Sequence, residues 1–307
     1  MDDFTQILTR YWGYTKFRPL QEEIIRSAYE GKDTLGLLPT GGGKSITFQV
    51  PAMAKEGICL VITPLIALMK DQVNNLNQRG IKALAIHSGL SREEIDIALD
   101  NCIYGDFKFL YLSPERLHTE IFKIRVQSMK VNLVAIDESH CISQWGYDFR
   151  PSYLKIADLR ELVPEAPFLA LTATATPKVV EDIMDRLNFR QRNHFQKSFE
   201  RKNLTYRVDH VEDKVRRLLN YCQDIKGTAI VYVRNRKKTR EIADILRTYK
   251  ISADYYHAGL SYELRSARQE DWQKGKTRII VSTNAFGMGI DKPNVRLVVH
   301  YDLPDSP

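Results

Sequence analysis

Short apolar runs rich in valine, isoleucine and leucine recur along the chain, and longer amphipathic stretches follow them. Runs without polar–apolar alternation predict strands that are buried on both faces. Strands that alternate with helices form a parallel sheet, so we expect an α/β fold. The predicted strands are Thr34–Leu38, Ile58–Ile62, Ala83–Ile86, Phe109–Leu112, Leu133–Ile136, Phe168–Leu171, Thr228–Val233, Arg278–Val281 and Leu297–Val299. A Ser91-x-x-Glu94 capping box predicts a helix from Arg92 to about Leu99.

The chain also repeats itself weakly at an offset of 170 residues. The clearest match sets His87–Ser91 on His257–Ser261, and an offset of 164 places Leu133–Ile136 on Leu297–His300. The other matched positions are Gly57, Val61, Leu76, Ile81, Ala83 and Gly105, which fall on Gly227, Val231, Leu246, Ile251, Ala253 and Gly275. Chance identity is the alternative, but a shared register predicts two similar α/β units in tandem, residues 1–203 and 204–307.

Composition limits the class of protein. The 45 Lys and Arg against 38 Asp and Glu give a net charge of +7, which fits an anionic partner such as nucleic acid. The longest apolar run, Ile58–Met69, is broken by Thr63 and Pro64 and falls short of the ~20 residues that a membrane helix needs. The four cysteines are scattered without a Cys-x-x-Cys pair. We expect a soluble intracellular protein, cytoplasmic or located at DNA, with packed reduced cysteines and neither a membrane partner nor structural zinc.

A glycine-rich segment, Pro39–Ser45, follows the first predicted strand and precedes a helix. Its three glycines, Gly41 to Gly43, allow the backbone to wrap around a phosphate at the positive end of a helix dipole. Lys44 can then reach the β and γ phosphates, and the Ser45 hydroxyl can bind Mg²⁺. The first glycine of the usual G-x-x-x-x-G-K-[ST] pattern is replaced by Leu38. A turn without function is the alternative.

Two acids, Asp137 and Glu138, directly follow the predicted strand Leu133–Ile136. Because parallel strands end at one edge of the sheet, a carboxylate here can lie beside the phosphate loop, where nucleoside triphosphatases hold their metal. We expect Asp137 to hold Mg²⁺, usually through water, and Glu138 to orient or deprotonate the attacking water.

An aromatic segment comes next: Trp145, Tyr147, Phe149 and Tyr153 accompany Arg150 without helix or strand periodicity. Aromatic faces on a loop can stack on nucleic acid bases, at about 1–3 kcal/mol per base. A small satellite core is the alternative.

A basic run, Arg234–Arg240, carries five cations in seven residues where the strand Thr228–Val233 turns into a helix. Cations at a helix N-terminus oppose the helix dipole unless an anion binds there. Phosphate binding would explain them, and a solvated face is the alternative.

Taken together, these motifs resemble the helicase core of the RecQ family of superfamily 2 DNA helicases. The resemblance runs from about Leu8 to the last residue. The matching segments are Trp12–Gln21 for adenine recognition, Thr40–Ser45 for motif I, Thr63–Val73 for Ia, Ser113–Arg116 for Ib, Asp137–His140 for II, Trp145–Arg150 for the aromatic loop, Leu171–Thr176 for III, Arg234–Arg240 for IV and Ala285–Pro293 for V.

The resemblance implies two RecA-like units that hold ATP and Mg²⁺ between them and move 3′ to 5′ along single-stranded DNA, unwinding forked duplexes. It implies catalytic roles for Lys44, Asp137, Glu138, His140 and Gln144. It implies ATP contacts for Tyr14, Arg18, Gln21, Thr40, Gly41, Gly42, Gly43, Lys44, Ser45, Gly287 and Asp291, and metal contacts for Ser45 and Asp137. It implies DNA contacts for Trp145, Phe149, Arg150, Arg234, Asn235, Arg236 and Thr283.

The chain departs from the family pattern at two places. Tyr147 occupies a position where many relatives carry histidine. Relatives also continue into a Gln-x-x-Gly-Arg-x-Gly-Arg helix whose arginine reaches the γ-phosphate, and this sequence ends at Pro307 before such a motif. We therefore expect the second unit to be incomplete. Because an arginine finger contributes about 10³–10⁵ in rate, we also expect ATP and DNA binding with weak hydrolysis. The alternatives are an RNA helicase, or a nucleotide- and nucleic-acid-binding module without catalysis.

Overall fold

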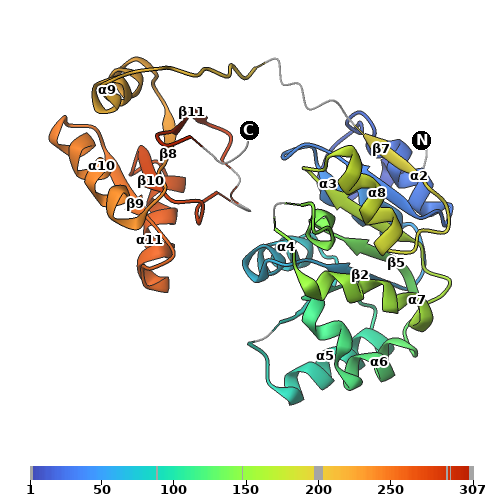
Figure 1. Cartoon of the computed structure of the whole chain (residues 1–307). Helices are drawn as coiled ribbons and strands as arrows, with labels where there is room; N and C mark the ends of the chain where they lie inside the picture. The colour runs from blue at the N-terminus through green and yellow to red at the C-terminus, as the bar shows by residue number, and fades with distance from the viewer. Residues whose placement is uncertain are drawn as a thin grey trace. The chain divides into compact units, whose positions relative to one another are not determined.

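The computed structural model describes residues 3–87, 89–146, 148–196, 203–287, 290 and 292–303. The chain divides into two compact units, residues 1–201 and 202–307, which Figure 1 colours from blue to yellow and from orange to red. Each unit is an α/β structure around its own parallel sheet, so the predicted fold class is confirmed.

Unit 1 contains a seven-stranded sheet in the order β3-β4-β2-β5-β6-β1-β7, and every ladder in it is parallel. The strands are β1 Thr34–Leu37, β2 Ile58–Ile62, β3 Ala83–Ile86, β4 Phe109–Leu112, β5 Val131–Ile136, β6 Phe168–Thr172 and β7 His194–Gln196. Strands β1, β6 and β5 lie side by side in this order, although 97 positions separate Thr34 at the start of β1 from Val131 at the start of β5. Their carboxyl ends therefore open at one place, where the site is built.

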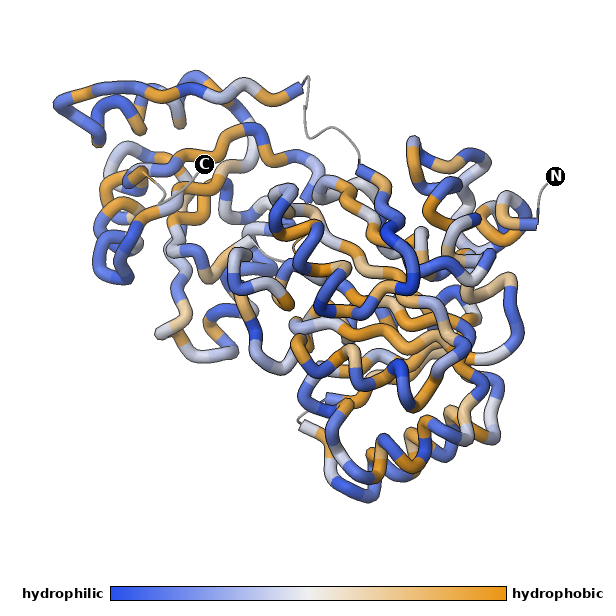
Figure 2. Tube along the Cα trace, turned by 45° about the vertical axis from the view of Figure 1, so that its right-hand side comes forward, coloured by the Kyte–Doolittle hydropathy of each residue, from blue (hydrophilic) through white to orange (hydrophobic). Residues whose placement is uncertain are grey.

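Helices cover both faces of this sheet. The helices are α1 Asp3–Trp12, α2 Gln21–Tyr29, α3 Lys44–Met53, α4 Ile66–Gln78, α5 Arg92–Tyr104, α6 Glu120–Val126, α7 Leu159–Leu162 and α8 Pro177–Arg186, with 3₁₀ turns at Pro114–His118, Ser139–Ile142 and Pro151–Asp158. One core contains side chains of α2, α3 and α4, and the core on the opposite face contains those of α5, α6 and α8. Figure 2 shows the strands as orange, hydrophobic segments inside bluer helices.

Unit 2 has a four-stranded parallel sheet in the order β11-β8-β10-β9. Its elements are α9 Lys214–Asp224, β8 Thr228–Tyr232, α10 Arg236–Thr248, β9 Ala253–Tyr256, α11 Tyr262–Gln273, β10 Ile279–Ser282 and β11 Val295–His300. Helices α9 and α10 pack in one core, and Trp272 of α11 packs with Phe286 in a second.

All nine predicted strands are present, with end shifts of one or two residues. The predictions missed β7, which is short and half exposed, and β9, whose Asp254 interrupts the apolar pattern. The capping box is confirmed: the Ser91 hydroxyl accepts from the Glu94 amide, and the Glu94 carboxylate accepts from the Ser91 amide. The helix continues past Leu99 to Tyr104.

All four cysteines are buried as free thiols, as the sequence predicted. Among the described residues, no helix combines the length and apolar character needed to span a membrane.

Candidate active site

The phosphate loop connects the fully buried strand β1 to α3. Gly41 and Gly43 have φ of +76° and +78°, a backbone region that favours glycine, and Gly43 is the N-cap of α3. The loop therefore leads backbone N–H groups toward a helix N-terminus, which is the arrangement that binds phosphate. Lys44 and Ser45 open the helix, as the sequence predicted.

Two residues predicted to contact adenine hold this loop from outside. The Gln21 side-chain amide donates to the carbonyls of Gly42 and Gly43, at 3.2 and 3.0 Å, and its oxygen accepts from the Arg18 amide at 2.8 Å. The Arg18 guanidinium donates to the Gly41 carbonyl. Both side chains therefore fix the conformation of the loop, a contact that the sequence alone did not indicate.

A cavity of about 360 Å³ opens beside the loop. Tyr14, Arg18 and Gln21 line it together with Gly43 and Ser45. A volume of this size lies within the range of small-molecule sites, and it begins where the phosphate loop begins. The structure thus brings the predicted nucleoside-binding residues and the phosphate loop together.

The two predicted acids follow β5 at the same sheet edge. Asp137 is 8% exposed, and its carboxylate accepts from the Glu138 amide at 3.0 Å. Burial raises the pKa of Asp137 to about 6, although Lys44 opposes that shift. Glu138 has a left-handed φ of +49°, which is strained for a residue with a side chain. Strain of this kind is typical of functional sites.

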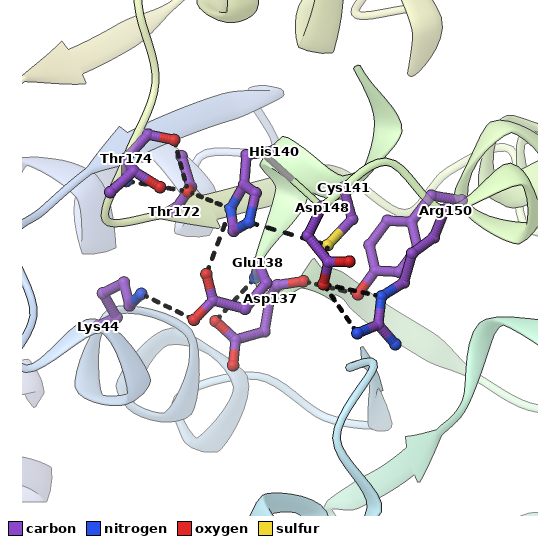
Figure 3. A network of polar contacts seen from close by, with 10 residues as sticks. Lys44, Asp137, Glu138, His140, Cys141, Asp148, Arg150, Thr172 and Thr174 are labelled. Carbon is purple, nitrogen blue, oxygen red and sulfur yellow. Dashed lines mark hydrogen bonds and ion pairs between the residues drawn. The ribbon is translucent and has the colours of Figure 1, made fainter. Parts of the chain in front are cut away.

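Glu138 lies at the centre of a polar network (Figure 3). Its two carboxylate oxygens face Lys44 Nζ at 3.5 Å and His140 Nδ1 at 3.3 Å. His140 Nδ1 also lies 2.8 Å from Thr172 Oγ1, which in turn contacts the backbone of Thr174. Burial lowers the pKa of His140 despite the attraction of Glu138. The network joins the ends of β1, β5 and β6. Thr172 and Thr174 were absent from the predicted site residues, although the match to motif III pointed at their segment.

These groups suit a metal–nucleotide ligand. A lysine at a phosphate loop, a hydroxyl at Ser45 and a buried carboxylate at Asp137 are the donors that such sites use for Mg²⁺ and phosphate. Ser45 lines the cavity. Asp137 follows β5, which only β6 separates from β1 in the sheet.

The aromatic segment divides into two parts. Trp145 is 63% exposed, and the Lys178 ammonium lies over its ring, 3.1 Å from the centroid. Gln144 is exposed and makes no polar contact with other described residues, while Phe149 is half-buried. Tyr153 is fully buried, and its hydroxyl donates to the Asp137 carbonyl at 3.0 Å. The prediction that Tyr153 belongs to a base-stacking loop is therefore wrong, because its ring packs in the core. Tyr147 lies outside the described residues.

Arg150 is held by its own loop. Its guanidinium pairs with Asp148 at 2.8 Å and donates to the Pro64 carbonyl at 3.4 Å. Figure 3 shows Asp148 and Arg150 side by side on the flank of the His140 network. One acid therefore already neutralises this cation.

In unit 2, the basic run begins α10. The Asn235 side chain caps the helix by accepting from the Lys238 amide at 2.8 Å. Asp302 accepts from the Arg234 amide and pairs with Lys238 at 3.3 Å. An acid of the same unit thus offsets part of the unfavourable charge at this helix start, and phosphate binding by the other cations of the run stays a prediction. The Arg236 side chain is exposed.

Gly287 has φ +119°, and a Cβ there would lie 2.6 Å from the Tyr232 hydroxyl. Tyr232 donates to the Phe286 carbonyl at 2.9 Å, and Thr283 begins the same turn. Asp291 lies outside the described residues.

Known proteins are similar to this chain in sequence and in fold. Residues 18–183 match the DEAD/DEAH box helicase family, and residues 211–307 match the helicase conserved C-terminal domain. The solved structures of the helicase MrfA bound to DNA and of Mycobacterium smegmatis helicase Lhr have the same fold, with TM-scores of 0.75 and 0.67 at 16% and 18% identity. They cover 99% and 94% of this chain, which covers 47% and 42% of theirs. The chain belongs to the DEAD/DEAH box helicases.

Within that class, the sequence matches the RecQ-type helicase core. It is 46% identical to the ATP-dependent DNA helicase RecQ of Bacillus subtilis over 97% of this chain and 51% of that protein. It is 42% identical to the RecQ of Haemophilus influenzae over 98% of this chain and 49% of that protein. The probable DNA helicase RecS of B. subtilis is 40% identical over 100% of this chain and 62% of its own length. The chain thus spans about half the length of two of these relatives, and the predicted family is confirmed.

Proposed function

We propose that this chain is the ATP-driven motor core of a DNA helicase that translocates 3′ to 5′ on single-stranded DNA and unwinds forked duplexes. Residues 1–203 would be the ATP-binding domain and residues 204–307 the second helicase domain. The observation that carries the proposal is the junction of Lys44, Glu138 and His140 at the carboxyl ends of β1 and β5, which flank β6 in the sheet. The relatives named ATP-dependent DNA helicases support DNA rather than RNA as the nucleic acid.

Each group has a role that follows from its position. Lys44 and the N–H groups of Gly41 to Gly43 would hold the phosphates, while Ser45 and Asp137 would hold Mg²⁺, which neutralises phosphate charge when it is bound. Glu138 is partly exposed beside Lys44, so its carboxylate can accept a proton from water. His140 connects Glu138 to Thr172, which links β6 to the water-orienting acid through one imidazole.

DNA contacts are proposed for Trp145, Phe149 and Arg150 in unit 1 and for Arg234, Asn235, Arg236 and Thr283 in unit 2. The exposed ring of Trp145 is free for stacking on the side that Lys178 does not cover. Arg236 offers an exposed cation for phosphate. Gln144 would sense DNA from the same loop.

ATP turnover tests the proposal. Turnover should rise with single-stranded DNA more than with RNA of the same length, and Lys44→Ala should reduce it at least about 100-fold, because the principal cation of the phosphate site is lost. Lys32→Ala, an exposed lysine paired with Glu30, is the matched control and should turn over normally.

Strand displacement from duplexes with a 3′ or a 5′ single-stranded end tests the polarity. Turnover that ignores DNA, or greater stimulation by RNA, would contradict the DNA motor. Nucleotide binding without any turnover in the 307-residue chain would favour the alternative, a nucleotide- and nucleic-acid-binding module without catalysis.

A further inference from the structure

The cavity beside the phosphate loop has a second wall that the nucleotide-binding residues above do not include. Gln72, Asn75 and Arg79 of α4 line it, together with Gln49 of α3. Gln72, Asn75 and Arg79 are spaced three and four residues apart, which places them on one face of the helix. The wall therefore presents three side-chain amides and one guanidinium.

The hydrogen-bonding capacity of Gln21 in the first wall is largely used. Gln21 spends both its amide oxygen and its NH₂ group on the backbone of Arg18, Gly42 and Gly43. Arg18 donates to Gly41. Tyr14 supplies an aromatic face, which is suited to stacking rather than to reading a polar edge.

The second wall retains free donors. Among the described residues, the Gln72 NH₂ group and the whole Asn75 amide have no hydrogen-bond partner. The Gln72 oxygen accepts from the Tyr111 hydroxyl at 2.9 Å. This bond orients the Gln72 amide with its oxygen toward Tyr111, and the NH₂ group is then the end available to a ligand. Arg79 donates to the Tyr11 carbonyl at 2.9 Å and so attaches α4 to α1 at the edge of the cavity.

Tyr111 is suited to hold Gln72 in this orientation. It is fully buried on β4, and burial raises the pKa of its hydroxyl, which therefore stays protonated and donates its hydrogen bond to Gln72. The Gln49 amide, 5% exposed, makes a longer contact of 3.5 Å to the same hydroxyl. A buried hydroxyl thus connects the two helices that form this side of the cavity.

We propose that Gln72 and Asn75 form a second nucleoside-reading wall, which donates hydrogen bonds to acceptor atoms of ATP, either purine ring nitrogens or ribose oxygens, with Tyr111 as the positioning residue for Gln72. The inference rests on the proposed ATP-binding function. A nucleoside whose phosphates lie at Gly43 and Ser45 enters the cavity between the two walls, where Tyr14 stacks and the α4 amides reach polar atoms.

Competition binding against a fluorescent ATP analogue tests this wall with ATP, 2′-deoxy-ATP and inorganic tripolyphosphate. Asn75→Ala and Gln72→Ala should each raise the Kd for ATP about two- to tenfold, which is the effect of one lost neutral hydrogen bond. The Kd for tripolyphosphate should stay within about twofold. Asn74→Ala is the matched control, because Asn74 is an exposed neighbour outside the cavity lining.

An equal loss for ATP and 2′-deoxy-ATP would assign the contact to the base or to the rest of the ribose, and a loss for ATP alone would assign it to the 2′-hydroxyl. Tyr111→Phe should reproduce the Gln72→Ala change and leave the Asn75 contact intact. Unchanged ATP affinity in Asn75→Ala and Gln72→Ala, or an equal loss for tripolyphosphate, would overturn the wall. Failure of the unsubstituted chain to bind ATP would instead overturn the proposed function.

Discussion

The sheet of unit 2 repeats one half of the sheet of unit 1, strand for strand. The order β3-β4-β2-β5 in unit 1 corresponds to β9-β10-β8-β11 in unit 2. Pairing register is also the same: Cys59 pairs with Phe109 and Leu133, and Ala229, 170 positions later, pairs with Ile279 and Leu297. The weak repeat in the sequence therefore reports a real structural repeat.

Similarity extends to the turns. Lys108 donates to the Gly57 carbonyl at 3.3 Å, and Arg278 donates to the Gly227 carbonyl at 2.9 Å. Helices α4 and α10 end alike, because the amides of Ile81 and Ile251 each donate to the carbonyl five positions earlier at 3.0 Å. Different side chains thus satisfy the same backbone groups.

The two units differ at the carboxyl end of the last shared strand. In unit 1, β5 is followed by Asp137 and Glu138, and Glu138 faces Lys44 and His140. In unit 2, β11 is followed by Tyr301 and Asp302, and Asp302 is neutralised by Lys238. The two strands share their backbone pairing. The two residues that follow each strand decide whether its end carries two acids, as in unit 1, or one acid paired with a lysine, as in unit 2.

The largest predicted contrast concerns the matched glycines Gly57 and Gly227. Both have positive φ, of +92° and +106°, but a Cβ at Gly57 would collide with the Lys130 carbonyl, whereas one at Gly227 would meet the flexible Arg296 side chain at 2.8 Å. Gly57→Ala should lower the free energy of unfolding of unit 1 by more than about 3 kcal/mol, and Gly227→Ala should lower that of unit 2 by about 1–2 kcal/mol. Hydrogen exchange resolved by mass spectrometry measures each unit separately. Equal losses of unfolding free energy in the two units would contradict this contrast, because they would show that the positive φ, and not the collision of the Cβ, determines the destabilisation.

The strand-end acids should respond to pH with opposite sign. The pKa of Asp137 is raised to about 6, so the folded unit holds this proton more tightly than the unfolded chain does. The stabilisation of unit 1 by the protonated carboxyl is full below the ordinary pKa of ~3.9 and is lost as pH rises through 6. Asp137→Asn should therefore stabilise unit 1 at pH 7.5, by about 1–3 kcal/mol, change little at pH 4, and abolish ATP turnover. The pKa of Asp302 is lowered overall. Burial alone would raise it, but the hydrogen bond from the Arg234 amide and the charge of Lys238 together outweigh burial. Its contribution is present above ~3.9 and lost as pH falls below that value.

At pH 7.5, Asp302→Asn should destabilise unit 2 by about 1 kcal/mol, because a charge-assisted pair is lost. Denaturant unfolding at pH 4 and pH 7.5, followed by hydrogen exchange, measures both substitutions. Destabilisation of unit 1 by Asp137→Asn at pH 7.5 would show that the attraction of Lys44 exceeds the cost of burying the carboxylate.

The sequence predicted much of this architecture because local signals and topology agree. Buried strands such as Ile58–Ile62 carry unbroken apolar runs, and the parallel sheet then brings Asp137 to the edge that carries Lys44. The contacts that were missed join residues distant in the chain without a local pattern. Gln21 reaches Gly43 over 22 positions, and Asp302 reaches Lys238 over 64.

Burial of individual aromatic residues was missed as well. Trp145 and Tyr153 lie only eight positions apart in one aromatic segment, yet one is exposed and the other is in the core. The difference arises because Tyr153 of the 3₁₀ turn Pro151–Asp158 belongs to the core cluster on the sheet, while Trp145 stays 63% exposed. Tyr153, Ile156 and Leu159 are all buried at the three-residue spacing of a 3₁₀ turn, a local signal that a search for helix or strand periods overlooks.

The smallest contrast concerns the helix N-caps at Ser91 and Ser261, which are also 170 positions apart. Ser91 takes part in a complete capping box with Glu94, whereas Ser261 accepts from the Leu264 amide at 3.3 Å without a reciprocal side-chain bond. Ser91→Ala should cost about 1–2 kcal/mol and Ser261→Ala about 0.5–1 kcal/mol, because the first removes one half of a reciprocal pair and leaves the Glu94 carboxylate without its fixed geometry. Matched Ser→Thr variants should retain most of the capping in both units. Hydrogen exchange in the first turns of α5 and α11 measures the two losses, and a larger loss at Ser261 would show that the packing of each helix, rather than its cap, determines how firmly its first turn is held.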